Sequence, residues 1–122
     1  MKKILVVEDE KESREIMVDV LREQGYTVFT AENGRVAIDV AQQKIPDLII
    51  MNVKMPELDG SEAMKIIRAN PETKNIPILF SSAFREEKSA HLKNTKLENA
   101  DFIVKPYNGE KLSEKVRELL KE

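Results

Sequence analysis

Short apolar runs alternate with amphipathic segments along the whole chain. Five of these runs are continuous rather than alternating, which is typical of strands that are buried on both faces of a sheet. The runs cover residues 4–7, 27–30, 48–51, 78–81 and 102–104. Because a segment of helical period follows each run, the pattern predicts an α/β fold, with a parallel sheet and helices on both faces.

Apolar residues in the segments between the runs recur at helical spacing, so that each segment predicts an amphipathic helix. The stripes are Ile16, Met17, Val20 and Leu21; Val36, Ala37, Val40 and Ala41; Met64 and Ile67; and Leu112, Val116, Leu119 and Leu120. Gly25 follows the first stripe and predicts its C-terminal cap, while Pro46 follows the second. Ser61 and Asn108 are predicted to begin the third and the last helix.

The segment 86–97 predicts a fourth helix with little to bury. Its apolar positions are only Ala90, Leu92 and Leu97. A helix with so few apolar residues gains little from packing, and we expect it to pack loosely and to move easily.

Composition and charge exclude several classes of function. The chain has 122 residues, 41% of them hydrophobic and 34% charged, which fits one soluble globular domain over residues 1–122. The net charge of −2 gives no basic excess for nucleic acid, and the absence of cysteine excludes disulfides and thiol catalysis. No apolar stretch approaches the ~20 residues of a membrane helix, and the first run is too short for a signal peptide, so we expect a cytoplasmic protein.

Polar residues follow the predicted strands at the point where each strand ends. Glu8 and Asp9 follow the first run, Asn52 the third, Ser82 the fourth and Lys105 the fifth. Parallel sheets bind ligands beyond the carboxyl ends of their strands, so these side chains should share one edge. Two carboxylates beside a third oxygen suit Mg²⁺, and a lysine or a hydroxyl can contact a phosphoryl oxygen.

A nucleotide-binding or flavin-binding enzyme on the same fold is the main alternative. Its first strand–helix loop should be rich in glycine, serine or threonine, so that the backbone can approach a phosphate. Here that loop covers 8–13 and reads EDEKES, without glycine. Its carboxylates would repel a pyrophosphate, and the sequence therefore disfavours this class.

Four motifs in a fixed order carry a family resemblance. They are ILVVEDE at 4–10, PDLIIMN at 46–52 with MP at 55–56 and DG at 59–60, PILFSSA at 77–83, and ADFIVKPY at 100–107. On these motifs the whole chain resembles a receiver domain of a two-component response regulator, of the chemotaxis-receiver type. The resemblance implies a flavodoxin-like doubly wound five-stranded parallel sheet of order 2-1-3-4-5.

The resemblance also implies a magnesium site and a phosphoacceptor. Asp9 corresponds to a direct ligand of Mg²⁺ (or Mn²⁺), Glu8 to one that acts through water, and Lys54 to one that supplies its backbone carbonyl. Position 52 corresponds to a further member of the metal site and to the aspartate that accepts a phosphoryl group from a histidine kinase or a phosphotransfer protein. The family is a signalling switch rather than an enzyme with an external substrate.

Three further residues correspond to the family's switch. Ser82 matches the hydroxyl that moves toward the phosphoryl group, and Phe102 the aromatic that turns inward when it does. Lys105 matches the invariant lysine, whose bond to Pro106 is typically cis. The resemblance implies a downstream protein target on the face of the fourth helix, fifth strand and fifth helix. It implies no direct contact with nucleic acid or membrane, and a monomer or weak dimer.

Asn52 departs from this pattern. The lone pair of an amide is delocalised, so Asn52 cannot act as the nucleophile that an aspartate would be. We therefore expect an unphosphorylated receiver with weakened binding of Mg²⁺. We interpret Asn52 as a deliberate replacement of Asp; the alternative is a natural degenerate receiver that acts as a phosphorylation-independent interaction module. Asn99 also replaces a usual glycine, and asparagine tolerates the left-handed conformation required there.

Overall fold

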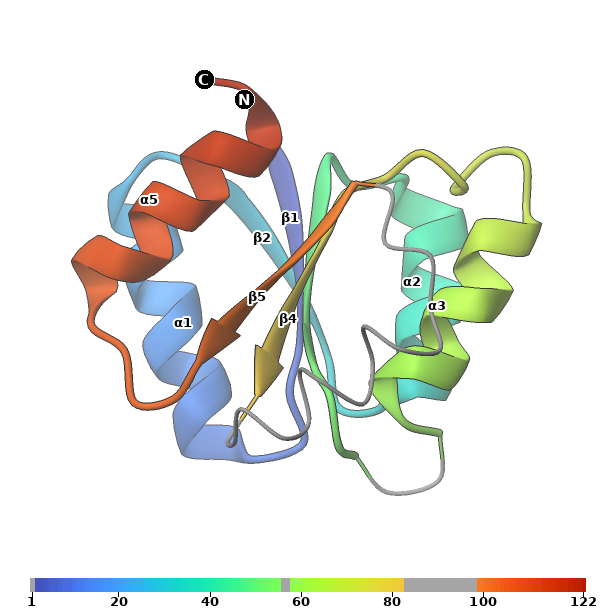
Figure 1. Cartoon of the computed structure of the whole chain (residues 1–122), viewed down its shortest axis with the longest axis horizontal. Helices are drawn as coiled ribbons and strands as arrows, with labels where there is room; N and C mark the ends of the chain where they lie inside the picture. Colours follow the sequence, from blue (N-terminus) through green and yellow to red (C-terminus); the bar gives the residue numbers. More distant parts are fainter. Residues whose placement is uncertain (1, 56–57, 83–98) are drawn as a thin grey trace.

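The computed structural model contains one sheet of five parallel strands in the order β2-β1-β3-β4-β5 (Figure 1). The strands are β1 (Lys3–Val7), β2 (Thr27–Ala31), β3 (Leu48–Asn52), β4 (Ile78–Ser82) and β5 (Ala100–Val104). The structure describes residues 2–55, 58–82 and 99–122. The predicted fold class and strand order are therefore confirmed.

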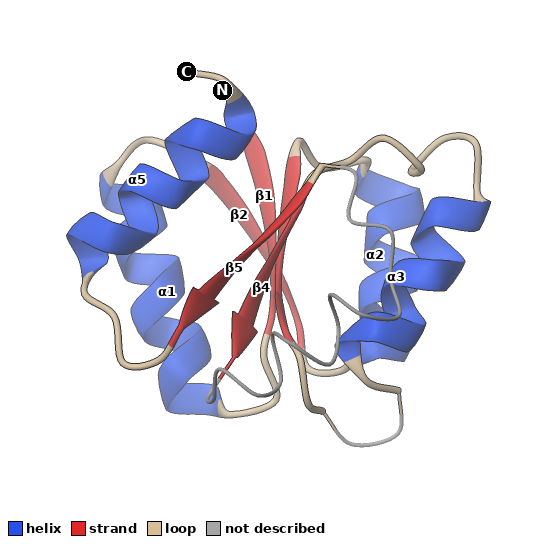
Figure 2. Cartoon of the chain, in the orientation of Figure 1, coloured by secondary structure: helices blue, strands red, loops and turns tan. Residues whose placement is uncertain are grey.

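Helices cover both faces of the sheet (Figure 2). They are α1 (Lys11–Glu23), α2 (Gly34–Lys44), α3 (Gly60–Ala69) and α5 (Gly109–Leu120). The pair α1 and α5 lies on one face, and α2 and α3 lie on the other. The helix predicted over 86–97 lies outside the described residues. No helix in the described part of the chain combines the length and the apolar character needed to cross a membrane.

Alternate residues of each strand contribute to two different apolar cores, one on each face of the sheet. In β1, Ile4 and Val6 pack toward α1 and α5, while Leu5 and Val7 pack toward α2 and α3. Successive side chains of a strand point to opposite faces, so a sheet covered on both sides must be apolar at every position. All four residues are fully buried. This explains why the runs are continuous.

The predicted start of the third helix is wrong by two residues. Asp59, not Ser61, is the N-cap of α3: its side chain accepts from the backbone N–H of Glu62 at 3.0 Å, and the Glu62 side chain accepts from Asp59 N. The Ser61 hydroxyl also donates to Asp59 Oδ1, at 2.9 Å. The Asp59 carboxylate therefore accepts from two donors at the start of α3. The prediction that Asn108 begins the last helix is confirmed, since its side chain caps α5.

Two residues of the predicted helix stripes are exposed. Ile16 is 64% exposed on α1 and Val36 is 40% exposed on α2, whereas Val18, outside the predicted stripe, is buried. Adjacent residues of a helix point about 100° apart around its axis. Each of these two predicted stripes contains two pairs of adjacent residues, and it is therefore wider than the face of the helix that contacts the sheet. The predicted left-handed conformations are confirmed at Gly25 (φ 94°), which follows α1, and at Asn99 (φ 54°).

Candidate functional site

The carboxyl ends of four strands bring the predicted polar residues to one edge of the sheet. The register aligns Val7 of β1 with Met51 of β3, and Asn52 with Ser81 of β4. Each strand therefore ends at the same level, and the residues that follow β1 and β5 turn over the same end of β3. This geometry is the reason that residues far apart in the sequence meet there.

The side-chain amide of Asn52 bridges the two carboxylates that follow β1. Its Nδ2 atom donates to Glu8 Oε2 at 2.8 Å and to Asp9 Oδ1 at 3.3 Å. A carboxylate ion only accepts hydrogen bonds, so the NH₂ end of the amide is the end that can face the pair. Three of the four residues that the sequence predicts for a metal site, Glu8, Asp9 and Asn52, are thus in direct contact.

Lys105 completes the cluster from the other end of the chain. Its Nζ atom donates to Glu8 Oε1 at 3.1 Å, so that both carboxylate oxygens of Glu8 are occupied. Glu8 is 1% exposed, and this burial raises its pKa, although the charge and the hydrogen bond of Lys105 oppose the rise. The predicted cis bond between Lys105 and Pro106 is confirmed.

Ser82 and Phe102 lie in the interior beside this cluster. Ser82 is fully buried at the end of β4, and its carbonyl accepts from the Lys105 backbone N–H at 2.7 Å. Phe102 is 4% exposed and stacks on Phe80, with ring centroids 5.3 Å apart. The aromatic side chain that the resemblance assigns to the switch is therefore in its inward position, while its movement with Ser82 stays a prediction.

The start of α3 packs closely against the backbone of position 52 at the end of β3. Gly60 N donates to the carbonyl of Val53 at 2.8 Å, and a Cβ atom on Gly60 would lie 2.6 Å from the Asn52 carbonyl oxygen. Only glycine permits that approach without displacement. Lys54, with an exposed side chain, follows β3 by two residues, and its role as a carbonyl ligand stays a prediction.

Sequence reasoning missed two residues that contact the site or its support. Arg14 of α1 donates from Nη1 to the backbone carbonyl of Glu8 at 2.9 Å, which holds the acidic loop against the helix. The hydroxyls of Tyr107 and Ser81 lie 3.5 Å apart. Arg14 gave no signal in the sequence, because one charged residue among several on α1 has no distinguishing pattern.

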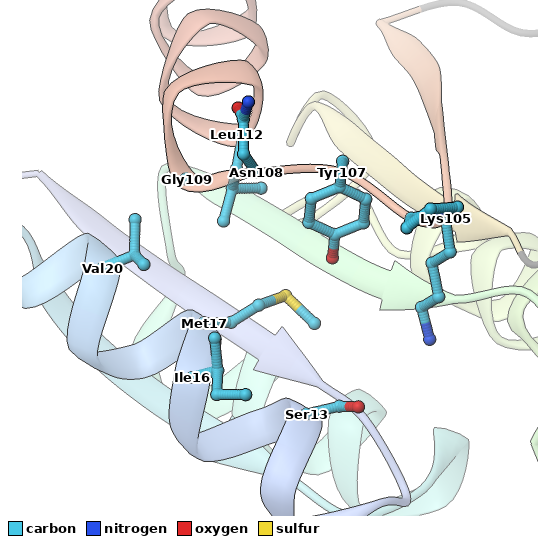
Figure 3. Close-up of a pocket in the computed structure, with 10 residues that line it drawn as sticks. Ser13, Ile16, Met17, Val20, Lys105, Tyr107, Asn108, Gly109 and Leu112 are labelled. Carbon is cyan, nitrogen blue, oxygen red and sulfur yellow. The ribbon is translucent and has the colours of Figure 1, made fainter.

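A groove of about 280 Å³ opens beside the cluster, between α1 and the start of α5 (Figure 3). Met17 of α1 and Tyr107 face into it from opposite sides, and Lys105 extends its amine at one end. Ile16 lies on its rim with 64% of its surface exposed. The groove is lined mainly by apolar side chains and is continuous with the polar site.

The cluster partly fits a hard divalent cation. Glu8 and Asp9 supply two carboxylates, which is the usual protein contribution to a magnesium site. Within 2–55, 58–82 and 99–122, no three His, Cys, Asp or Glu side chains gather closely enough to hold a metal ion. Position 52 is the reason, because it presents an amide nitrogen where a third carboxylate would complete the group.

Comparisons with known proteins agree with the fold. The family model of the response regulator receiver domain matches residues 4–117. The chain is 33% identical over 120 residues to the alkaline phosphatase synthesis transcriptional regulatory protein PhoP of Bacillus subtilis, covering 98% of this chain and 49% of that protein. It spans less than half the length of the first curated relatives that it matches.

Two solved structures show the same similarity. The chemotaxis protein CheY4 of Vibrio cholerae superposes with a TM-score of 0.87 and 32% identity, covering 98% of each chain. The second is the receiver domain of the sensor histidine kinase PA1611 of Pseudomonas aeruginosa, which has a magnesium ion in its active-site cleft. It superposes with a TM-score of 0.88 and 26% identity, covering 99% of this chain and 98% of that one. The chain belongs to the response regulator receiver domain family of two-component signalling.

Proposed function

We propose that this chain is a receiver in which Asn52 replaces the phosphoacceptor Asp, so that it cannot be phosphorylated at position 52 and stays in its unphosphorylated form. The observation that carries the proposal is the Asn52 amide, which occupies the centre of the acidic cluster and donates to Glu8 at 2.8 Å. Transfer of a phosphoryl group requires an oxygen nucleophile positioned in line with the donor. The amide offers neither a carboxylate oxygen nor an available lone pair on nitrogen.

The remaining residues support the chemistry that an aspartate at this position would perform. Glu8, Asp9 and the carbonyl of Lys54 would hold Mg²⁺ or Mn²⁺, which supplies charge neutralisation for phosphoryl oxygens when bound. Lys105 places an ammonium group on the same cluster, 3.1 Å from Glu8. Ser82 stands at the end of β4, from which its hydroxyl would approach a phosphoryl oxygen.

The experiment compares this chain with Asn52→Asp, each treated with acetyl phosphate and Mg²⁺. We expect an added mass of about 80 Da, one phosphoryl group, on Asn52→Asp only. Lys105→Met in the Asn52→Asp background is the control, and it should lower the phosphorylated fraction. Phosphorylation of the unmodified chain at residue 52 would contradict the proposal. Failure of Asn52→Asp to react would show that the cluster is not a phosphoryl-transfer site.

We further propose that a histidine kinase or phosphotransfer protein docks over the groove between α1 and α5. An exposed isoleucine on the rim of an apolar groove is a feature of protein contact sites. Ile16 has this position, and the groove leads directly to Lys105. In the Asn52→Asp background, Ile16→Glu should reduce transfer from a panel of histidine kinases. Ile66→Glu, on the opposite helix layer at 44% exposure, should leave transfer unchanged.

A natural receiver that works without phosphorylation is the second candidate. The inward position of Phe102 favours it, because the aromatic is already stacked on Phe80 with Asn at position 52. Under this proposal the face that includes β5 and α5 binds its protein target constitutively. The codon at position 52 in the source genome distinguishes a natural asparagine from a replaced aspartate. Target binding that depends on a phosphodonor would contradict the second candidate.

A further inference from the structure

The Asn52 amide nitrogen donates to both members of the acidic pair. Its Nδ2 atom lies 2.8 Å from Glu8 Oε2 and 3.3 Å from Asp9 Oδ1. Hydrogen bonds from an amide to ionised carboxylates are stronger than bonds between neutral groups. Each carboxylate therefore already accepts a hydrogen bond from a positively polarised group that belongs to the chain itself.

A divalent cation needs the same two carboxylates and would occupy the same space. It also requires every ligand to present an oxygen. As the structure stands, Asn52 presents hydrogen atoms to the space between Glu8 and Asp9. A cation can enter only after both amide hydrogen bonds break and the amide turns its nitrogen away.

The Glu8 carboxylate has little freedom to avoid this competition. Glu8 is 1% exposed, and its second oxygen is held by Lys105 Nζ at 3.1 Å. The backbone of Glu8 is fixed as well, since its N–H donates to Ala31 and its carbonyl accepts from Arg14. Glu8 therefore cannot rotate toward a cation while it keeps these partners.

From this geometry we propose that Asn52 closes the acidic pair to divalent cations, as an internal competitor of the cation rather than one of its ligands. The inference rests on the cation site proposed above and assigns position 52 a role of its own in that site. The replacement of a carboxylate by an amide then does more than remove a ligand and a charge. It supplies a built-in occupant that holds the cluster together without a metal ion.

The two possible roles of Asn52 predict opposite effects of its removal. If the amide oxygen were a ligand, Asn52→Ala would bind Mg²⁺ more weakly than the unmodified chain. If the amide is a competitor, Asn52→Ala should bind Mg²⁺ more tightly, although it offers one side-chain oxygen fewer. We expect a dissociation constant lower by about threefold to tenfold, the range that corresponds to about one typical net hydrogen bond.

Magnesium titrations of four proteins by calorimetry test this: the unmodified chain, Asn52→Ala, Asn52→Asp and Asn75→Ala. Asn75 is an exposed asparagine at the opposite end of the sheet and serves as the matched control. Tighter binding by Asn52→Ala, with Asn75→Ala unchanged, supports the inference. Equal or weaker binding by Asn52→Ala overturns it. Absence of binding by Asn52→Asp overturns the cation site itself, and the inference with it.

A second measurement uses the unmodified chain and does not depend on how the variants fold. In ¹⁵N–¹H spectra, the side-chain NH₂ protons of Asn52 should exchange with water more slowly than those of Asn75, by about tenfold. Saturating Mg²⁺ should abolish this protection, because the amide must leave the carboxylates. Exchange at the same rate as Asn75 without metal, or protection that persists at saturation, overturns the inference.

Discussion

The ammonium group of Lys105 lies 3.1 Å from Glu8 Oε1, although the two residues are 97 positions apart in the chain. Glu8 is 1% exposed and the Lys105 side chain is 32% exposed, so the pair joins a buried carboxylate to a partly solvated cation. Burial and Lys105 act on the pKa of Glu8 in opposite directions, and burial has the larger effect. The ion pair therefore limits a destabilisation that the buried carboxylate would otherwise produce.

Removal of the cation should expose this destabilisation. We expect Lys105→Met to lower the free energy of unfolding by about 1–2 kcal/mol, which is less than for a fully buried pair because Lys105 is partly solvated. In a Glu8→Gln background the same change should cost less than about 0.5 kcal/mol, since no buried charge is left uncompensated. Urea unfolding of the four proteins measures both values. Equal losses in the two backgrounds would show that Lys105 contributes through packing alone.

Asn52→Asp should destabilise the fold when no divalent cation is present. The change removes both amide donors and places a third carboxylate beside Glu8 and Asp9. We expect a loss of about 1–2 kcal/mol in EDTA, from unfavourable charge and lost hydrogen bonds. Mg²⁺ at roughly 10 mM should restore much of it, because a ligand of the native state stabilises by mass action. Identical urea midpoints in EDTA would refute this.

The edge of the sheet that carries the site follows from the sequence. Continuous apolar runs predict strands buried on both faces, and parallel strands must end at a common edge. Any polar residue directly after such a run is therefore expected within a few ångströms of that edge. For this reason the sequence predicts that four residues meet, without knowledge of their individual contacts: Glu8, Asp9, Asn52 and Lys105.

The orientation of side chains within that edge does not follow from the pattern. Which end of the Asn52 amide faces Glu8 depends on the charge of its neighbours in space, and Phe102 turns inward because Phe80 offers a stacking surface. The start of α3 was predicted two residues late, because both Asp59 and Ser61 are good capping residues and only the turn geometry selects one. Ile16 fits the helical period but lies outside the contact with the sheet.

Tyr26 should ionise at unusually high pH. Burial, and then the hydrogen bond from its hydroxyl to Glu122 at 2.8 Å, raise the pKa of Tyr26 from 10.0 to about 12. A raised pKa means that the fold favours the protonated phenol. This contribution to stability is therefore complete below pH 10.0 and is lost as the pH rises through about 12.

Absorbance of tyrosinate, recorded for the chain and for Tyr26→Phe, isolates this residue from Tyr107. The difference between the two titrations should have its midpoint near pH 12. Glu122→Gln keeps a hydrogen-bond acceptor for the Tyr26 hydroxyl but removes the negative charge. It should lower the Tyr26 midpoint only in part, because burial is the larger cause of the raised pKa. A difference titration centred on 10.0, the ordinary value, would contradict the assignment. At neutral pH, Tyr26→Phe should lose about 0.5–1 kcal/mol of stability.

Two glycines at equivalent helix positions should respond in opposite ways to alanine. Gly60 and Gly109 are each the first residue of a helix, after the N-caps Asp59 and Asn108. A Cβ atom on Gly60 would lie 2.6 Å from the Asn52 carbonyl oxygen, which is backbone and cannot move aside cheaply. A Cβ atom on Gly109 would meet only the Val20 side chain at 3.5 Å, an ordinary contact.

We therefore expect Gly60→Ala to lower the free energy of unfolding by about 1–3 kcal/mol through overpacking. Gly109→Ala should raise it by about 0.4–1 kcal/mol, because alanine restricts the unfolded chain and favours helix. Thermal unfolding resolves changes of this size. The same steric conflict should disturb position 52, so Asn52→Asp combined with Gly60→Ala should be phosphorylated more slowly than Asn52→Asp combined with Gly109→Ala. If both alanine variants were equally stable and equally reactive, the start of α3 could shift away from Asn52 at little cost, and Gly60 would not position residue 52.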